Sequence, residues 1–210
     1  MDLIKDKNSK FIFAGIALGG LSTTESAVAL LDRNMHIITL DKLFSIGDVK
    51  YFLNNLAGKK NAVILISIPE NEVMLSCKWK YNSRTYDLVN FDKKMMNRDG
   101  WTDRFSTRGS EYFRKLKSLG ADIFRFYTYD IKMFYYPDNA FKDRTPVDCK
   151  ALQDTFRIKY NMRELPVNML PVAQLEAVSG AMCIRDFILK NDDSGFKIIS
   201  EYEGLPVIGS

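Results

Sequence analysis

Residues 11–19 have the sequence FIFAGIALG, a continuous apolar run that ends in glycines at positions 19 and 20. A run of this kind is typical of a buried strand that stops at a turn. Two further short apolar segments follow after polar turns, SAVALLD at 26–32 and MHIITLDK at 35–42. Three strands joined by such short turns predict an antiparallel meander.

The next two segments add a helix and a fourth strand. In residues 45–58, SIGDVKYFLNNLAG, the apolar residues recur at helical spacing, Ser45 is a suitable N-cap and Gly58 a suitable stop. Residues 61–69, NAVILISIP, form a second fully apolar run. Because a helix separates this run from the meander, we expect it to lie parallel to the first strand.

Periodicity is weaker in the second half, but several segments have recognisable ends. We expect a helix at 110–120 with Ser110 as its cap and Gly120 past its end, and one or two strands at 121–137. The pair Thr145–Pro146 predicts the start of another helix, since a capping residue precedes a proline in the first turn. A long helix at 172–191 and a closing strand or extended tail at 196–204 complete the prediction.

Composition places the chain among ordinary globular proteins. It has 210 residues, of which 46% are hydrophobic and 12% aromatic, enough for a sizeable core in one domain over residues 1–210. We find no apolar run long enough for a membrane helix and no secretory signal, so we expect a cytoplasmic location without membrane contact. Three widely spaced cysteines exclude a complete disulfide framework and a CxxC metal knuckle.

The segment after the fourth strand, residues 71–108, has the composition of a basic, aromatic insertion. Between residues 78 and 117 the chain carries 11 basic and five acidic residues, together with both tryptophans. Cations interleaved with aromatic rings are typical of single-strand nucleic-acid binders, in which cations neutralise phosphates and rings stack on bases. The plainer interpretation is a solvated charged face with a few packed aromatics. The candidate nucleic-acid-binding residues are Lys78, Trp79, Lys80, Arg84, Lys93, Lys94, Arg98, Trp101 and Arg104.

Several segments together resemble an uncharacterised family of predicted nucleases with the ribonuclease H-like fold. The resemblance lies in FIFAGIALGGLSTTESAVALLD, NAVILISIPENE, MFYYP, QLEAVSGAMCIRDFILKN and the tail EYEGLPVIGS. It implies an α/β fold: a mixed sheet of three antiparallel strands followed by parallel strands, flanked by helices, with an insertion after strand 4. It also implies a two-metal nuclease site, with carboxylates on strand one, strand four, a later strand and the last helix.

The positions that match those carboxylates hold other residues: Ala17, Ser67, Tyr135 and Ser179. Because two divalent cations about 4 Å apart need several negative ligands, a chain without these carboxylates lacks the expected metal site. We therefore expect a catalytically degenerate domain that needs no cofactor and acts by binding nucleic acid or a protein partner.

One alternative is a working nuclease that holds Mg²⁺ or Mn²⁺ with displaced carboxylates. The candidates are Glu25 at the start of the second strand, Glu70 after the fourth, and Glu176 one turn before Ser179. Ordinary surface acids are the plainer interpretation of these residues, although Glu176 is predicted on the inner face of its helix. Another alternative is a structural or oligomerising protein that uses the aromatic insertion as an interface.

The first glycine turn also resembles the phosphate loop of the sugar-kinase and actin-like superfamily, which implies nucleotide binding. The metal-positioning Asp of that loop would again fall on Ala17. The chain's single histidine, His36, lies in an apolar strand segment with no partner evident for nucleophilic catalysis, and one histidine cannot form a histidine-rich metal site.

Overall fold

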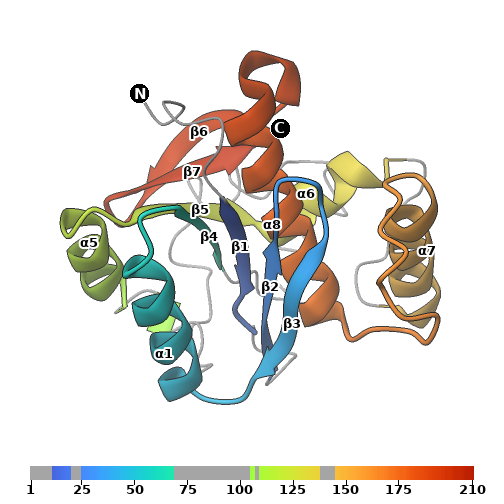
Figure 1. Ribbon diagram of the computed structural model, residues 1–210, viewed down its shortest axis with the longest axis horizontal. Coiled ribbons are helices and arrows are strands. Elements are labelled where there is room, and N and C mark those ends of the chain that lie inside the picture. Colours follow the sequence, from blue (N-terminus) through green and yellow to red (C-terminus); the bar gives the residue numbers. More distant parts are fainter. Residues whose placement is uncertain (1–10, 20–24, 69–104, 107–108, 138–144) are drawn as a thin grey trace, which may run out of the picture.

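The computed structural model of the chain describes residues 11–19, 25–68, 105–106, 109–137 and 145–210. Within these residues seven strands form one mixed sheet, in the order β3-β2-β1-β4-β5-β7-β6 (Figure 1). The strands are β1 (Ile12–Ala17), β2 (Ser26–Leu31), β3 (Ile37–Leu43), β4 (Ala62–Ile68), β5 (Asp122–Tyr127), β6 (Lys197–Tyr202) and β7 (Leu205–Gly209). The fold is therefore an α/β fold whose sheet begins with an antiparallel meander.

The first four strands confirm the sequence prediction. β1 pairs antiparallel with β2, β2 antiparallel with β3, and β1 parallel with β4. Every residue of β2 and β4 is buried, as the unbroken apolar runs predict for strands covered on both faces. β4 also pairs parallel with β5, so the centre of the sheet is parallel.

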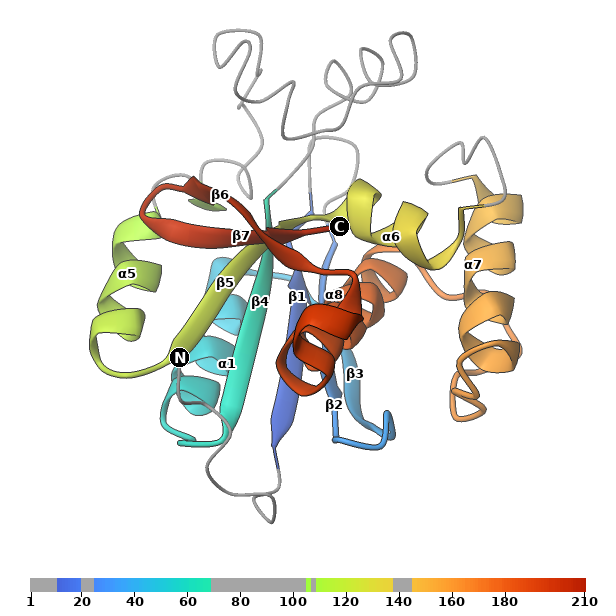
Figure 2. The same cartoon turned by 90° about the horizontal axis from the view of Figure 1, so that it is seen from above.

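Helices cover both faces of the sheet and create two separate apolar cores. One face carries α1 (Ile46–Ala57) and α5 (Ser110–Ser118), and the other carries α6 (Thr128–Tyr135), α7 (Pro146–Ile158) and α8 (Val172–Lys190) (Figures 1 and 2). α8 crosses the sheet so closely that a Cβ at Gly15 of β1 would overlap the Ala177 carbonyl oxygen and the Ala181 backbone nitrogen. Glycine at position 15 therefore sets the distance between α8 and the sheet.

Helix ends follow the predicted capping residues in two cases and differ in a third. The Ser45 hydroxyl accepts a hydrogen bond from the Asp48 backbone N–H at 3.1 Å, and Asp48 completes a capping box. Thr145 caps α7 in the same way. The prediction that Ser110 caps α5 is wrong: Gly109 is the N-cap, and the Ser110 hydroxyl donates to the Ser106 carbonyl.

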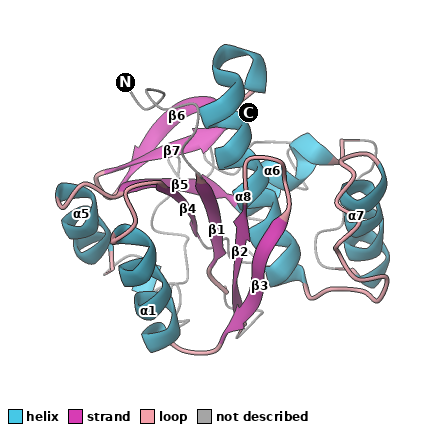
Figure 3. Cartoon of the chain, viewed as in Figure 1, coloured by secondary structure: helices cyan, strands magenta, loops and turns pink. Residues whose placement is uncertain are grey.

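Residues 128–135 are helical where the sequence predicts a strand. β5 ends at Tyr127 and α6 follows directly, so the MFYYP segment lies on and just after a helix (Figure 3). Aromatic residues favour strands, but Thr128, Lys132 and Tyr135 are buried at helical spacing. Packing of that face against α7 and α8 outweighs the local strand preference.

The carboxyl-terminal segment forms a hairpin rather than a single strand. β6 and β7 pair antiparallel around Glu203 and Gly204, both of which have positive φ. Two such residues make the tight turn that matches strand twist. β7 inserts between β5 and β6 and pairs parallel with β5, so the end of the chain extends the central sheet.

Among the described residues, no helix combines the length and the apolar composition that crossing a bilayer requires.

Candidate functional site at the carboxyl edge of the sheet

The candidate site lies where the parallel strands β1 and β4 end. Ala17 is the last residue of β1, and Ser67 is the next to last of β4. α6 starts directly after the neighbouring strand β5, so it lies at this same edge (Figure 2). In open α/β sheets this edge is where ligands usually bind.

Ala17 and Ser67 are fully buried, and neither side chain has a carboxylate that could bind a metal ion. The Ser67 hydroxyl oxygen accepts a hydrogen bond from the Leu18 backbone N–H at 2.7 Å. Nearby, the Ser26 hydroxyl oxygen accepts one from the Gly19 N–H at 3.0 Å. Both hydroxyls thus satisfy buried backbone donors just past β1, which is a structural role.

Ser179 is also fully buried, and its hydroxyl donates to the Leu175 carbonyl one turn earlier at 2.8 Å. This is the usual partner of a serine inside a helix. Ser179 therefore contributes neither a carboxylate nor a free hydroxyl to the site.

Glu176 is buried on α8, at 3% exposure, and directly precedes Ala177, whose carbonyl oxygen would overlap a Cβ at Gly15 of β1. Its Oε1 lies 2.7 Å from Nζ of Lys132 on α6, and their side chains are only 5% and 1% exposed. The plainer interpretation of Glu176 as a surface acid is therefore wrong. A buried carboxylate requires a compensating charge, and here the Lys132 ammonium supplies it.

Lys132 is a residue that the sequence analysis missed. It lies in TYDIKMFY, a segment with strong strand propensity, which hides the helical period that places Lys132 on the buried face. In a helix, Lys132 lies one turn after Thr128 on the same face. A helix predicted at 128–135 would therefore have indicated a buried cation.

Tyr135 lies on α6 instead of the predicted strand and belongs to an aromatic cluster. Its ring packs edge-on against Phe156 and Tyr160 of α7 and its C-terminal extension, at centroid distances of 5.9 and 5.2 Å. Burial raises the pKa of the Tyr135 phenol well above its ordinary value, with nearby Cys183 and Asp186 adding to the shift. The phenol is thus neutral and cannot stand in for a metal-binding carboxylate.

Of the other two candidates for displaced metal ligands, the structure describes Glu25 but not Glu70. Glu25 Oε1 forms an ion pair with Lys42 Nζ on β3 at 3.0 Å, and both side chains are partly exposed. Glu70 lies outside the described residues. So do all nine candidate nucleic-acid-binding residues between Lys78 and Arg104, since only residues 105 and 106 of the predicted insertion are described.

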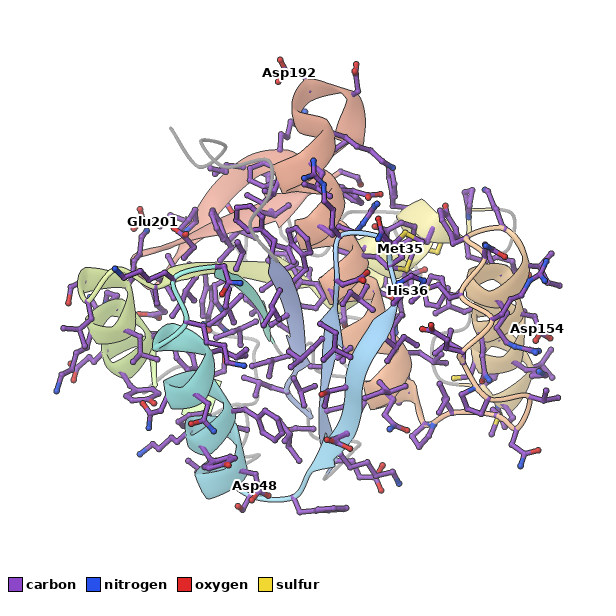
Figure 4. The ribbon with its side chains drawn as sticks, viewed as in Figure 1. Met35, His36, Asp48, Asp154, Asp192 and Glu201 are labelled. Atoms are coloured by element: carbon purple, nitrogen blue, oxygen red, sulfur yellow. The ribbon has the colours of Figure 1, made fainter. Side chains whose placement is uncertain are left out.

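His36 is exposed at the turn before β3, next to Met35 (Figure 4). Its Nδ1 lies 3.1 Å from Oδ2 of Asp32, and the Asp32 Oδ1 accepts the His36 backbone N–H at 2.9 Å. Asp32 thus holds the turn between β2 and β3 together. His36 has the exposure expected of a structural turn residue and not the enclosure of a catalytic base.

A second buried cation, Arg125, lies in the middle of β5 and was also missed. Its guanidinium donates to the carbonyls of Ile66 at 3.1 Å and Ser67 at 2.9 Å. It lies between the rings of Phe113 and Tyr202, on the α5 face of the sheet, and burial lowers its pKa to about 10. The signal in the sequence is one arginine among the Ile, Phe and Tyr residues of β5. An arginine there can be buried only if its hydrogen bonds are supplied from within the fold.

The described side chains at this edge do not fit a pair of divalent cations. No three His, Cys, Asp or Glu side chains among the described residues gather closely enough to hold a metal ion. Mg²⁺ and Mn²⁺ prefer carboxylate oxygens, whereas positions 17, 67 and 179 hold an alanine and two hydrogen-bonded serines, and the Glu176 carboxylate is paired with Lys132.

The chain has no match among protein-family models, curated proteins or solved structures.

Proposed function

We propose that the chain is a catalytically degenerate ribonuclease H-like domain that acts by binding nucleic acid. The sheet order β3-β2-β1-β4-β5, with its antiparallel meander and parallel centre, supports the fold part of this proposal. The observation that carries the loss of the metal site is the buried ion pair between Lys132 and Glu176.

The Lys132 ammonium balances the charge of Glu176, as bound cations would do for the carboxylates of a metal site. Carboxylates at a two-metal site are stabilised by divalent cations. Glu176 is the buried acid on this part of α8, and the Lys132 ammonium already neutralises it at hydrogen-bonding distance. A metal ion bound to Glu176 would lie beside the buried Lys132 ammonium, and repulsion between the two cations makes such binding energetically costly.

Nucleic acid is the proposed partner because of the charge distribution along the chain. The +4 net charge is modest, but residues 78–117 alone contain 11 basic and five acidic residues. Phosphate neutralisation by such residues releases counterions, so affinity should fall steeply with salt. Lys78, Trp79, Lys80, Arg84, Lys93, Lys94, Arg98, Trp101 and Arg104 are the residues proposed to make these contacts.

The test measures binding and cleavage with the same full-length protein. Fluorescence anisotropy with a labelled single-stranded oligonucleotide should show an affinity that falls about three-hundredfold between about 50 and 200 mM salt if about six phosphates are contacted. Incubation with single-stranded and duplex substrates in Mg²⁺ or Mn²⁺ should give no cleavage. Absence of binding, or binding that is insensitive to salt, would refute the nucleic-acid part.

Cleavage would favour the alternative of a metal-dependent nuclease with Glu176 and one of Glu25 or Glu70 as ligands. In that case Glu176→Gln should abolish the activity, because the amide cannot supply a negatively charged ligand. Cleavage that survives in a folded Glu176→Gln protein would place the activity elsewhere.

A further inference from the structure

A hollow of about 520 Å³ lies at the corner where β3 ends and α1 begins. Its lining comes from the end of β3, the turn that follows and the first two turns of α1: Asp41, Lys42, Leu43, Phe44, Asp48, Tyr51 and Phe52. The register of the meander brings the end of β3 beside the start of β2, and so to the edge at which β1 ends. This β3–α1 hollow therefore lies at the carboxyl edge of the sheet, beside its outermost strand.

Aromatic rings form an exposed apolar surface in the β3–α1 hollow. Of the three aromatic side chains that the described part of the chain leaves exposed, two line it: Phe44 at 69% and Tyr51 at 65% exposure. Phe52 is half-buried, and its ring meets the Tyr51 ring edge-on at a centroid distance of 5.8 Å. Single exposed apolar side chains are common, but a cluster of them around a hollow indicates a binding surface.

The lining also carries two carboxylates. Oδ2 of Asp48 accepts two backbone N–H groups of the turn before α1, at 2.9 and 2.8 Å, and its charge offsets the positive amino end of that helix. Asp41 is exposed and forms no hydrogen bond or ion pair with any residue in the described ranges. Asp41 therefore leaves an uncompensated negative charge beside the rings.

The cations closest to this carboxylate in the sequence have other partners. Lys42, which also lines the hollow, forms an ion pair with Glu25 at 3.0 Å. Lys50 of α1 does not line the hollow, and its Nζ lies 5.6 Å from the ring centroid of Tyr112 on α5. Neither lysine therefore neutralises Asp41, and a cation from outside the chain can do so.

A guanidinium group matches this combination of rings and carboxylate. It is planar and weakly hydrated, it stacks on aromatic rings, and it donates two parallel hydrogen bonds to a carboxylate. An ammonium group is strongly hydrated, and an open hollow does not compensate for the loss of its water. Because Lys42 is paired with Glu25, no lining cation can hold the α-carboxylate of a free amino acid, which favours a side chain within a polypeptide.

We propose that the β3–α1 hollow binds an arginine side chain from a basic segment of a partner protein. The guanidinium stacks on Phe44 and Tyr51 and pairs with Asp41. This interaction goes beyond the proposed nucleic-acid-binding function and is independent of it, because an uncompensated carboxylate repels the phosphates of nucleic acid.

The first experiment titrates the ¹⁵N-labelled full-length protein with three capped amino acids and follows backbone amide signals by NMR. Nα-acetylarginine amide should shift the signals of the lining residues in a saturable way at roughly millimolar concentration, as exposed cation–π contacts and one ion pair predict. The lysine analogue should bind at least about threefold more weakly, because its ammonium keeps its water. The citrulline analogue, which has nearly the same shape without the charge, should give no saturable shift. Equal binding of the citrulline analogue, or tighter binding of the lysine analogue, would overturn the guanidinium assignment.

Asp41→Asn tests the carboxylate. It should weaken binding of the arginine probe about fivefold, the upper value for an exposed ion pair. Asp192→Asn is the matched control, because Asp192 is also an exposed carboxylate and lies at the opposite end of the molecule from Asp48 (Figure 4). The control should change the affinity less than about twofold. Equal weakening in both variants would mean that net charge, and not the hollow, governs binding.

The double variant F44L/Y51L tests the rings, because leucine keeps an apolar side chain without a π-system. It should weaken binding about tenfold, since each exposed cation–π contact contributes a factor of about three. Tyr51→Phe, which keeps the ring, should bind like the wild type, and thermal unfolding should show that all variants are folded. Unchanged binding by a folded F44L/Y51L protein would reject the stacking contacts.

Further results would overturn the assignment to a partner protein. Tighter binding of free arginine than of the capped probe would indicate an amino-acid ligand, and tighter binding of choline would indicate a small quaternary ammonium compound. Loss of oligonucleotide binding in the F44L/Y51L variant would assign the hollow to nucleic acid instead. Absence of binding by every probe would reject the hollow as a cation site and leave the proposed nucleic-acid-binding function intact.

Discussion

Nζ of Lys132 on α6 lies 2.7 Å from Oε1 of Glu176 on α8, and both side chains are buried. The pair joins the helix that follows β5 to the helix that crosses β1, at the edge where the strands end. Its energetic role can be separated from any role in metal binding by replacing one partner or both.

Removing one partner should destabilise the protein strongly. Glu176→Gln leaves the buried Lys132 ammonium without its carboxylate, and such uncompensated charges cost about 3–5 kcal/mol. Urea denaturation should show this loss in the free energy of unfolding. The double variant K132M/E176L, with apolar side chains of similar volume, should recover most of the loss, whereas a double variant as unstable as the single one would contradict a charge-based explanation.

Gly15→Ala should be among the most destabilising small substitutions in the chain. The added Cβ would overlap backbone atoms of Ala177 and Ala181, so α8 must move away from β1. We expect a loss of about 3 kcal/mol or more. Gly58→Ala is the matched control, since φ at Gly58 is −72° and the new Cβ would lie 3.6 Å from its nearest neighbour. That control should be neutral or stabilising by up to about 1 kcal/mol, and similar losses in both variants would refute the contact.

Asp48, at the amino end of α1, should give the protein a component of stability that depends on pH (Figure 4). Hydrogen bonds from the Phe44 backbone N–H, and from Ser45, lower the pKa of Asp48 below its ordinary value of 3.8. A carboxylate with a lowered pKa stabilises the folded state above its unfolded pKa, and this contribution is lost as pH falls through the folded pKa. Asp48→Asn should therefore have a lower Tm than the wild type at pH 7, and the difference should shrink as the pH falls below 3.8. A difference in Tm that stays constant between pH 7 and the acid limit would show that the charge plays no part.

The sequence was sufficient to predict the elements whose apolar patterns are unambiguous. The runs at 11–19 and 61–69 predict two buried strands, and the intervening helix predicts their parallel pairing, which the register confirms. Ser45 and Thr145 mark helix starts because each is a side-chain acceptor followed by helical spacing. These predictions succeed because local pattern and tertiary environment agree.

Other elements depend on contacts that the sequence does not display. Residues 128–135 favour a strand locally and become a helix because α7 and α8 bury one side of them. The partner of Glu176 is 44 residues away, and its identity follows only from the position of α6. The likeness of Ala17, Ser67 and Ser179 to lost metal ligands remains a prediction, although their burial and backbone hydrogen bonds are compatible with it.

The measurement that addresses the proposed loss of the metal site most directly is a calorimetric titration of the full-length protein with Mn²⁺ at neutral pH. With Glu176 neutralised by Lys132 and no carboxylate at positions 17, 67 or 179, we predict no binding heat up to millimolar metal. Saturable binding at micromolar Mn²⁺ would contradict the proposal, and its loss in a Glu176→Gln protein that remains folded would identify a rebuilt metal site.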